Sequence, residues 1–119
     1  LKIKEISYIH AEGYSTSSLK HGPFALLEPE FPVILLCPND IHYSKSMNAY
    51  EEIKSRHASI IKITNNEEEN KYTIKIPDNT TFLHLLMIIP LQFLSYELAL
   101  VRNLNPDMPR NLAKVVTVE

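Results

Sequence analysis

The feature that most constrains the fold of this chain is an uninterrupted apolar run, VILLC at residues 33–37, closed by the turn signal Pro38-Asn39-Asp40. A strand that is apolar at every position, and not only at alternate ones, is typical of a parallel sheet with both faces covered. Two more strand patterns follow, SIIKIT at 59–64 and YTIKI at 72–76. In the last one Thr73 and Lys75 alternate outward, which favours a place at a sheet edge.

Helical patterns separate and follow these strands. Residues 43–57 carry apolar side chains at helical spacing, and residues 80–102 form a long apolar segment that Pro90 should bend. Strands that alternate with helices indicate a parallel sheet flanked by helices. We therefore predict an α/β fold, a three-layer αβα sandwich. Ligands of such folds bind where the carboxyl ends of the strands meet the loops.

Composition narrows the possible functions. The chain has 119 residues, a net charge of −2 and no basic cluster, which fits one modest domain and argues against a nucleic-acid partner. The single cysteine, Cys37, lies inside the apolar run and should be a buried thiol of a cytoplasmic protein. The segment 82–101 has membrane length, but it contains four polar or helix-disturbing residues, so we expect a core helix and no membrane partner (His84, Pro90, Gln92 and Glu97).

The first residues already follow a helical pattern. Ile3, Ile6 and Ile9 recur at helical spacing, which predicts a helix over residues 1–14 that ends near Gly13. No capping residue precedes Leu1. We therefore expect the chain to be a C-terminal piece of something longer.

Three sets of polar residues are candidates for chemistry. Lys2 and Glu5 are three residues apart on one helix face, His21 precedes the break Gly22-Pro23, and Lys114 lies in the apolar tail NLAKVVTVE. Taken singly, each has an ordinary structural explanation: an exposed ion pair, a turn histidine, and a lysine that points to water. It is their occurrence together that indicates function.

Four stretches carry a resemblance to a known family: KIKEISYIHAE (2–12), LKHGP (19–23), PLQFLSYELAL (90–100) and PRNLAKVVTVE (109–119). In this order they resemble the C-terminal end of the glucosamine-6-phosphate synthases, the isomerising glutamine–fructose-6-phosphate transaminases. The first two stretches alone would indicate only the wider sugar isomerase (SIS) superfamily. Position 18 is serine where the family commonly has an acidic residue. The resemblance implies a flavodoxin-like SIS half-domain over residues 1–102, followed by a tail at 103–119 that closes over the sugar site.

The resemblance also implies residue roles. Glu5 would move a proton between C1 and C2 of the sugar, with Lys2 tuning the carboxylate or relaying protons. His21 would open the cyclic sugar, reaching the site of the neighbouring subunit. Lys114 would form a Schiff base with the ketose carbonyl, and the backbone around Ala113 would contact the sugar. The Gly22-Pro23 turn would then fix the approach of the imidazole.

The implied reaction converts fructose 6-phosphate and glutamine-derived ammonia to glucosamine 6-phosphate, with no cofactor and no metal. The implied partners are a glutaminase domain and a first SIS domain upstream in the same chain, and a second subunit in a homodimer. The isolated piece should be inactive, because the phosphate-binding loop lies in a missing part. Two alternatives stay open: a phosphosugar-binding module of a transcription regulator, and a sugar-phosphate deglycase. The lysine in the tail favours the synthase over both.

Overall fold

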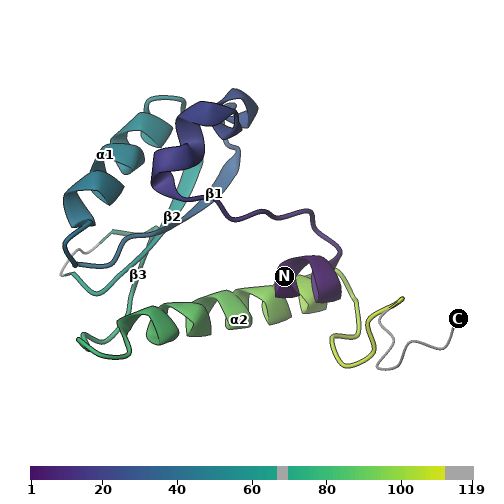
Figure 1. Cartoon of the computed structure of the whole chain (residues 1–119). Coiled ribbons are helices and arrows are strands. Elements are labelled where there is room, and N and C mark those ends of the chain that lie inside the picture. Colours follow the sequence, from purple (N-terminus) through teal and green to yellow (C-terminus); the bar gives the residue numbers. More distant parts are fainter. Residues whose placement is uncertain (67–69, 112–119) are drawn as a thin grey trace, which may run out of the picture. The chain divides into compact units, whose positions relative to one another are not determined.

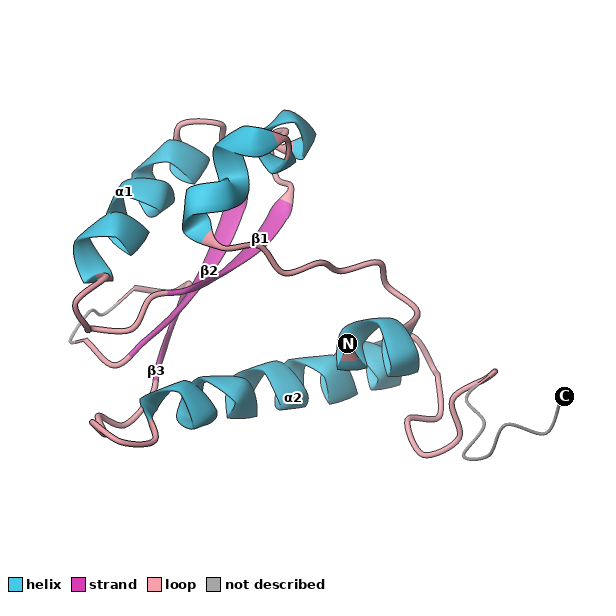
Figure 2. Cartoon of the chain, in the orientation of Figure 1, coloured by secondary structure: helices cyan, strands magenta, loops and turns pink. Residues whose placement is uncertain are grey.

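The computed structural model describes residues 1–66 and 70–111. Ala113 and Lys114, and with them residues 112–119 of the predicted tail, lie outside the described residues. Within these described residues the regular elements are three strands, two α-helices and three short helical turns (Figures 1 and 2). In chain order these are the π-helical turn Ile3–Ser7, the 3₁₀ turns Thr16–His21 and Pro23–Leu26, strand β1 Pro32–Leu36, helix α1 Tyr43–Lys54, strands β2 Ser59–Thr64 and β3 Thr73–Lys75, and helix α2 Leu83–Val101.

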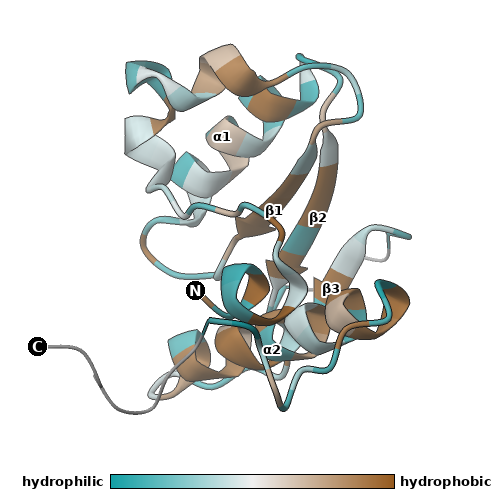
Figure 3. Ribbon diagram, turned by 90° about the vertical axis from the view of Figure 1, so that its right-hand side faces the viewer, coloured by the Kyte–Doolittle hydropathy of each residue, from teal (hydrophilic) through white to brown (hydrophobic). Residues whose placement is uncertain are grey.

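The three strands form one parallel sheet in the order β1-β2-β3. Pro32 lies opposite Ser59 in the first pair, and Lys62 lies opposite Thr73 in the second. The prediction of an α/β fold with a parallel sheet is therefore confirmed, and β3 is an edge strand as its alternating pattern indicated. Figure 3 shows hydrophobic residues along β1 and β2, which provide the apolar surface for the core.

Residues Tyr14–Pro90 form one compact unit around this sheet. Helix α1 packs on β1 and β2, and its Ile53 side chain is only 1% exposed. Cys37 is a fully buried free thiol, as predicted, with its sulfur 3.8 Å from that of Met47. Other buried apolar side chains of the unit come from all three strand regions and from both α-helices (Leu35, Ala49, Ile63, Ile76, Leu83 and Met87).

Polar contacts join the loops that follow the three strands. The backbone N–H of Asn39, after β1, donates to Oδ1 of Asn65, after β2, at 2.7 Å. The Asn65 side-chain amide in turn donates to Oδ1 of Asp78, after β3, at 2.7 Å. These bonds cross-link the carboxyl ends of the strands, which fixes the loops at the edge where ligands of parallel sheets bind.

The segment Leu1–Gly13 forms a second compact unit with the chain from Leu91 onward. The boundary between the units lies at Pro90, inside α2, where proline cannot donate the usual helical hydrogen bond. Among the described residues of this unit the buried ones are all small: Ser7, Ser95 and Ala99. Each buried hydroxyl donates to a carbonyl four residues earlier, so its burial leaves no polar group unpaired.

The predicted helix over residues 1–14 is wrong in its length. Helical structure is confined to one turn, Ile3–Ser7, and Tyr8 adopts φ +56° and ψ +26°. A left-handed residue stops an α-helix, and the chain between Tyr8 and Ser15 has no regular structure. The apolar periodicity of the sequence continues through Ile9, but the left-handed backbone at Tyr8 ends the helical structure before that residue.

The expected burial of the first strand on both faces is only partly present. Leu35 is buried, but Leu36 is 39% exposed, and β1 lies at an edge of the sheet because β2 is its one neighbour among the described strands. An apolar strand at an open edge is unusual, because such edges invite pairing with other chains. The sequence of this strand is that of an interior strand.

Helix α2 is far less buried than a core helix should be. It has 19 residues and a mean hydropathy of 1.6, and by length and composition alone it could cross a membrane. The core helix of a soluble protein passes the same test. Here, however, seven of its large apolar side chains are exposed, including Phe93 at 66% (also Leu85, Ile88, Ile89, Tyr96, Leu100 and Val101). We call these seven residues the α2 apolar face.

Candidate functional site

The turn Ile3–Ser7 carries the first pair of candidate residues. Lys2 Nζ lies 2.8 Å from Glu5 Oε2, so the predicted pair forms. The two side chains differ in exposure, 60% for Lys2 and 20% for Glu5. The lysine therefore lies on the solvent side of a partly sheltered carboxylate. A carboxylate in this position can accept and return a proton.

Tyr8 terminates this turn and fixes its end. A non-glycine residue in the left-handed region costs roughly 1 kcal/mol or more, so a tyrosine at φ +56° needs a compensating contact. Its side chain makes two with Arg110. The Arg110 backbone N–H donates to the Tyr8 hydroxyl at 2.8 Å, and the guanidinium lies 4.1 Å from the ring centroid. These contacts join the turn that holds Glu5 to the last described residues of the chain.

His21 ends the 3₁₀ turn Thr16–His21 and is exposed. The next residue, Gly22, has φ +137° and ψ −53°, a backbone conformation that L side chains rarely adopt. A Cβ at Gly22 would meet nothing within 4 Å, so the glycine is required by the backbone and not by crowding. Pro23 then opens the next 3₁₀ turn with its fixed φ. The Gly-Pro pair thus reverses the chain directly behind an imidazole that faces solvent.

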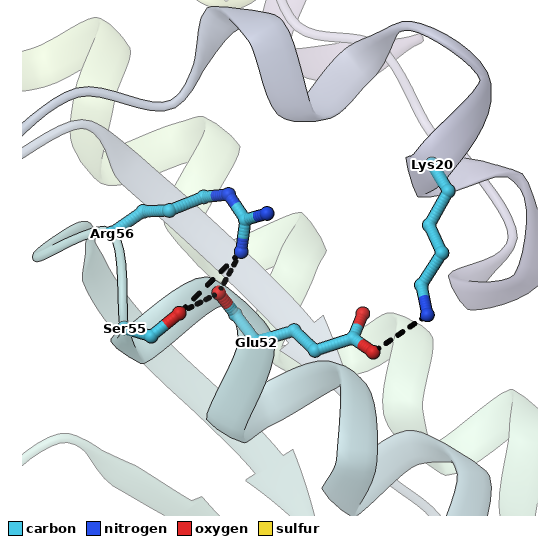
Figure 4. Close-up of polar contacts among 4 residues, drawn as sticks. All are labelled: Lys20, Glu52, Ser55 and Arg56. Carbon is cyan, nitrogen blue, oxygen red and sulfur yellow. Dashed lines mark hydrogen bonds and ion pairs between the residues drawn. The ribbon is translucent and has the colours of Figure 1, made fainter.

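Two contacts, one with α1 and one with the turn that follows it, hold the segment around His21. On one side Lys20 Nζ lies 2.8 Å from Glu52 Oε1 (Figure 4). On the other side the Arg56 guanidinium lies 4.2 Å from the centroid of the Phe24 ring. Arg56, in the turn after α1, also donates from Nη1 to the backbone oxygen of Glu52, which links the two contacts (Figure 4). His21 therefore lies in a segment that is held by a contact on each side of it in the sequence, through Lys20 and Phe24.

The structure brings together some of the predicted site residues and not others. Lys2 and Glu5 are in contact, whereas His21 belongs to the other compact unit. Ala113 and Lys114 lie outside the described residues. Sequence reasoning missed Tyr8 and Arg110, which are 102 positions apart and share no local pattern. Both do lie inside the stretches that carried the family resemblance, which was the available signal.

No metal site is evident in the described part of the chain. Within residues 1–66 and 70–111 there is no group of three His, Cys, Asp or Glu side chains that could hold a metal ion. The chemical groups that the described residues offer are a carboxylate, an ammonium and an imidazole. These suit proton transfer on a polar substrate.

Curated proteins with similar sequences match the whole of this chain. The curated relatives include a probable isomerising glutamine–fructose-6-phosphate aminotransferase of Acanthamoeba polyphaga mimivirus, 57% identical over 122 residues. The aminotransferase of the same name from Chlorobaculum tepidum is 47% identical over 125 residues. In both cases the match covers 100% of this chain but 20% of the relative, so the chain spans about a fifth of the length of these relatives.

Solved structures of two sugar-phosphate enzymes have a fold similar to that of this chain. The C-terminal domain of glucosamine-fructose-6-phosphate aminotransferase from Francisella tularensis superposes with a TM-score of 0.80 at 32% identity, over 90% of this chain and 32% of that one. A glucosamine-6-phosphate deaminase from Thermotoga maritima gives a TM-score of 0.72 at 26% identity, over 97% of this chain and 34% of that one.

The family model decides the assignment. The model described as "SIS domain" matches residues 1–102, which include the turn with Glu5, the His21 turn, the whole sheet and both α-helices. The parallel sheet and the fold of the solved relatives agree with that match. This chain belongs to the SIS-domain family.

Proposed function

We propose that this chain is the sugar-isomerising end of an isomerising glutamine–fructose-6-phosphate aminotransferase. The observation that carries the proposal is the Lys2–Glu5 pair, a partly sheltered carboxylate 2.8 Å from an ammonium. It lies in a chain whose whole length is 57% identical to a relative of that name. The full reaction needs the larger part of the protein, because the chain spans about a fifth of such relatives.

Glu5 would carry the proton transfer. The Lys114 amine would add to the C2 carbonyl of fructose 6-phosphate and water would leave. Ammonia would then add to this Schiff base and the lysine amine would leave, which gives an imine at C2. Glu5 would next remove a proton from C1 and return one to C2, while the O1 hydroxyl proton passes to the imine nitrogen, so that C1 becomes the aldehyde carbon and C2 carries the amine of glucosamine 6-phosphate. No external oxidant is needed, because the redox change is internal to the sugar. Lys2, whose Nζ donates to Glu5 Oε2 at 2.8 Å, would orient the carboxylate or relay protons.

The other predicted residues take complementary roles. His21 would open the sugar ring, since an imidazole can both accept and donate a proton near neutral pH. Its exposure and its anchored segment suit a group that reaches into the site of a neighbouring subunit. Lys114 would hold the open ketose as a Schiff base before ammonia arrives, and the backbone at Ala113 would contact the sugar.

The longer protein would act as a cytoplasmic homodimer. Upstream of this chain it would carry a glutaminase, a first SIS domain and the opening strands of the present domain. The apolar composition of β1 at an open sheet edge supports a missing neighbouring strand. The product would enter amino-sugar biosynthesis, on the route to UDP-N-acetylglucosamine.

An assay of the longer protein tests this function against its alternatives. We expect it to form glucosamine 6-phosphate from fructose 6-phosphate and glutamine, measured by mass spectrometry of the sugar. A deglycase, such as the similarity to a glucosamine-6-phosphate deaminase would suggest, would release ammonia from glucosamine 6-phosphate and ignore glutamine. A phosphosugar-binding module would bind the sugar without turnover. Either of these results would replace the proposal.

The α2 apolar face leads to a separate prediction about assembly. In the longer protein we expect the face to be covered by the part of the protein that is absent here. The 119-residue chain alone should therefore bind a hydrophobic dye and self-associate. Phe93→Glu should reduce both effects in the isolated chain, because Phe93 is 66% exposed there.

Light scattering measures the self-association of the isolated chain, and dye fluorescence measures the exposure of its apolar surface. Thr81→Glu, a polar position just before α2, is the matched control and should leave both readouts unchanged. A monodisperse monomer that binds no dye would contradict the assignment of the face as an internal contact.

A further inference from the structure

Glu52 of helix α1 is linked to the chain on both sides of His21. Its carboxylate lies 2.8 Å from Nζ of Lys20, the residue directly before the histidine. Its backbone carbonyl accepts a hydrogen bond from Arg56, whose guanidinium lies 4.2 Å from the ring centroid of Phe24, three residues after the histidine. Figure 4 shows the carboxylate of Glu52 facing Lys20 and its carbonyl facing Arg56. We call Glu52 and Arg56, with these two contacts, the Glu52–Arg56 brace.

The turn directly behind His21 is built on Gly22, which packing does not hold. Gly22 adopts φ +137° and ψ −53°, and glycine reaches other backbone conformations at little cost. Among the described residues, no atom lies within 4 Å of the place that a Cβ at this position would occupy. The direction of the imidazole relative to α1 therefore depends on contacts at the two flanks of the turn. The brace supplies a contact at each flank, through Lys20 and Phe24.

The brace is poorly placed to stabilise the fold. The Lys20 side chain is 65% exposed and that of Glu52 is 36% exposed, and Arg56 is exposed as well. Ion pairs and cation–π contacts at exposed sites contribute little to the free energy of unfolding. Buried apolar side chains hold α1 on the sheet instead, among them Ala49 and Ile53. Loss of the brace should therefore leave the domain folded while it frees the turn.

We infer that Glu52 and Arg56 are positioning residues, which hold the His21 imidazole in the orientation that opens the sugar ring. This rests on the proposed function. In ring opening the imidazole removes the proton of the anomeric hydroxyl and gives a proton to the ring oxygen, while the bond between C2 and that oxygen breaks and the C2 carbonyl forms. Such a group must lie within hydrogen-bond reach of the sugar. A displacement of about 1 Å can cost on the order of 100-fold in rate.

The first arm of the test measures the turn itself, in the longer protein and without activity. The Ala25 N–H donates to the Gly22 carbonyl at 2.9 Å, so hydrogen–deuterium exchange of the Ala25 amide reports opening of the turn. In the double variant Glu52→Gln/Arg56→Gln this amide should exchange at least about threefold faster. Glu51→Gln removes the neighbouring exposed carboxylate of α1 and is the matched control, which should leave the exchange unchanged.

The second arm is a mutant cycle, which asks whether the brace acts through His21. In the wild-type background the double variant should lower kcat for glucosamine 6-phosphate formation by about tenfold. In the His21→Gln background, where the sugar ring opens only spontaneously, the same substitutions should cost less than about twofold. A general structural effect would lower kcat by one factor in both backgrounds. Arg56→Lys in place of Arg56→Gln keeps a cation near the Phe24 ring and should recover part of the loss.

The inference and the proposed function fail in different ways. A loss of less than about twofold in the double variant, or an equal loss in both backgrounds, overturns the inference. Exchange of the Ala25 amide at the wild-type rate overturns it as well, and this result decides if His21→Gln is too slow to assay. Thermal unfolding identifies variants that fail to fold, and Glu52→Gln alone then takes the place of the double variant. If the wild-type protein forms no glucosamine 6-phosphate, the proposed function is wrong, because that result does not depend on the brace.

Discussion

Borohydride should trap fructose 6-phosphate on Lys114 of the longer protein and on no other lysine. The amine adds to the C2 carbonyl and water leaves, and hydride then reduces the imine to a stable secondary amine. Lys114→Arg should lose trapping completely, because a guanidinium stays protonated and cannot form the imine. Peptide mass spectrometry locates the adduct, and this all-or-none result is the largest effect that we predict.

Two other lysines serve as internal controls for that experiment. Lys2 is paired with Glu5 and Lys20 with Glu52, each at 2.8 Å, so both side chains are already engaged by a carboxylate. Neither should carry the sugar. The isolated 119-residue chain should also fail to trap sugar, since the phosphate-binding part would be absent. An adduct on Lys2 or Lys20 would show that the role given to the C-terminal lysine is wrong.

Glu5→Gln in the longer protein should reduce sugar isomerisation by about 10²–10⁴-fold, the usual contribution of a positioned acid–base group. Glutamine has the same shape and keeps a hydrogen-bonding side chain, but it cannot take up the C1 proton. Sugar-phosphate binding should stay close to normal, because the phosphate would be held in another part of the protein. The exchange of the C1 proton with deuterium from solvent measures isomerisation, and calorimetry measures sugar-phosphate binding.

Glu12→Gln is the matched control for that loss, because it removes a carboxylate from the same segment beyond the turn that ends at Tyr8. It should behave like the wild-type protein. Lys2→Met removes the ammonium that lies 2.8 Å from Glu5 and should give an intermediate loss. Near-normal turnover of Glu5→Gln would overturn the assignment of the carboxylate.

Local patterns predicted the sheet well. The β-branched run at residues 59–64 is β2 with the same bounds, and the long apolar segment contains α2. These patterns work because burial of apolar side chains determines both periodicity and strand order. The helix over residues 1–14 was wrong because its end depends on Tyr8, whose left-handed backbone is stabilised by Arg110 from the far end of the chain. No window of sequence contains that contact.

In the candidate site, too, local sequence patterns predicted some features, whereas contacts between distant segments could not be predicted. The Lys2–Glu5 pair follows from helical spacing alone, and the role of Gly22 follows from its place before a proline. The anchoring of the His21 segment could not be predicted, because the Lys20–Glu52 and Phe24–Arg56 contacts need the three-dimensional packing of α1. The exposed α2 apolar face differs from the core helix that residues 82–101 led us to expect.

We propose that this chain supplies Glu5 and Lys114 to one sugar-isomerising site. A crystal structure of the longer protein with fructose 6-phosphate tests it most directly. We predict the open-chain sugar with a Glu5 carboxylate oxygen within about 3.5 Å of C1 or C2, the distance of a near-attack arrangement, and Lys114 Nζ at C2. A sugar bound well away from Glu5, with that carboxylate still paired only with Lys2, would contradict the account.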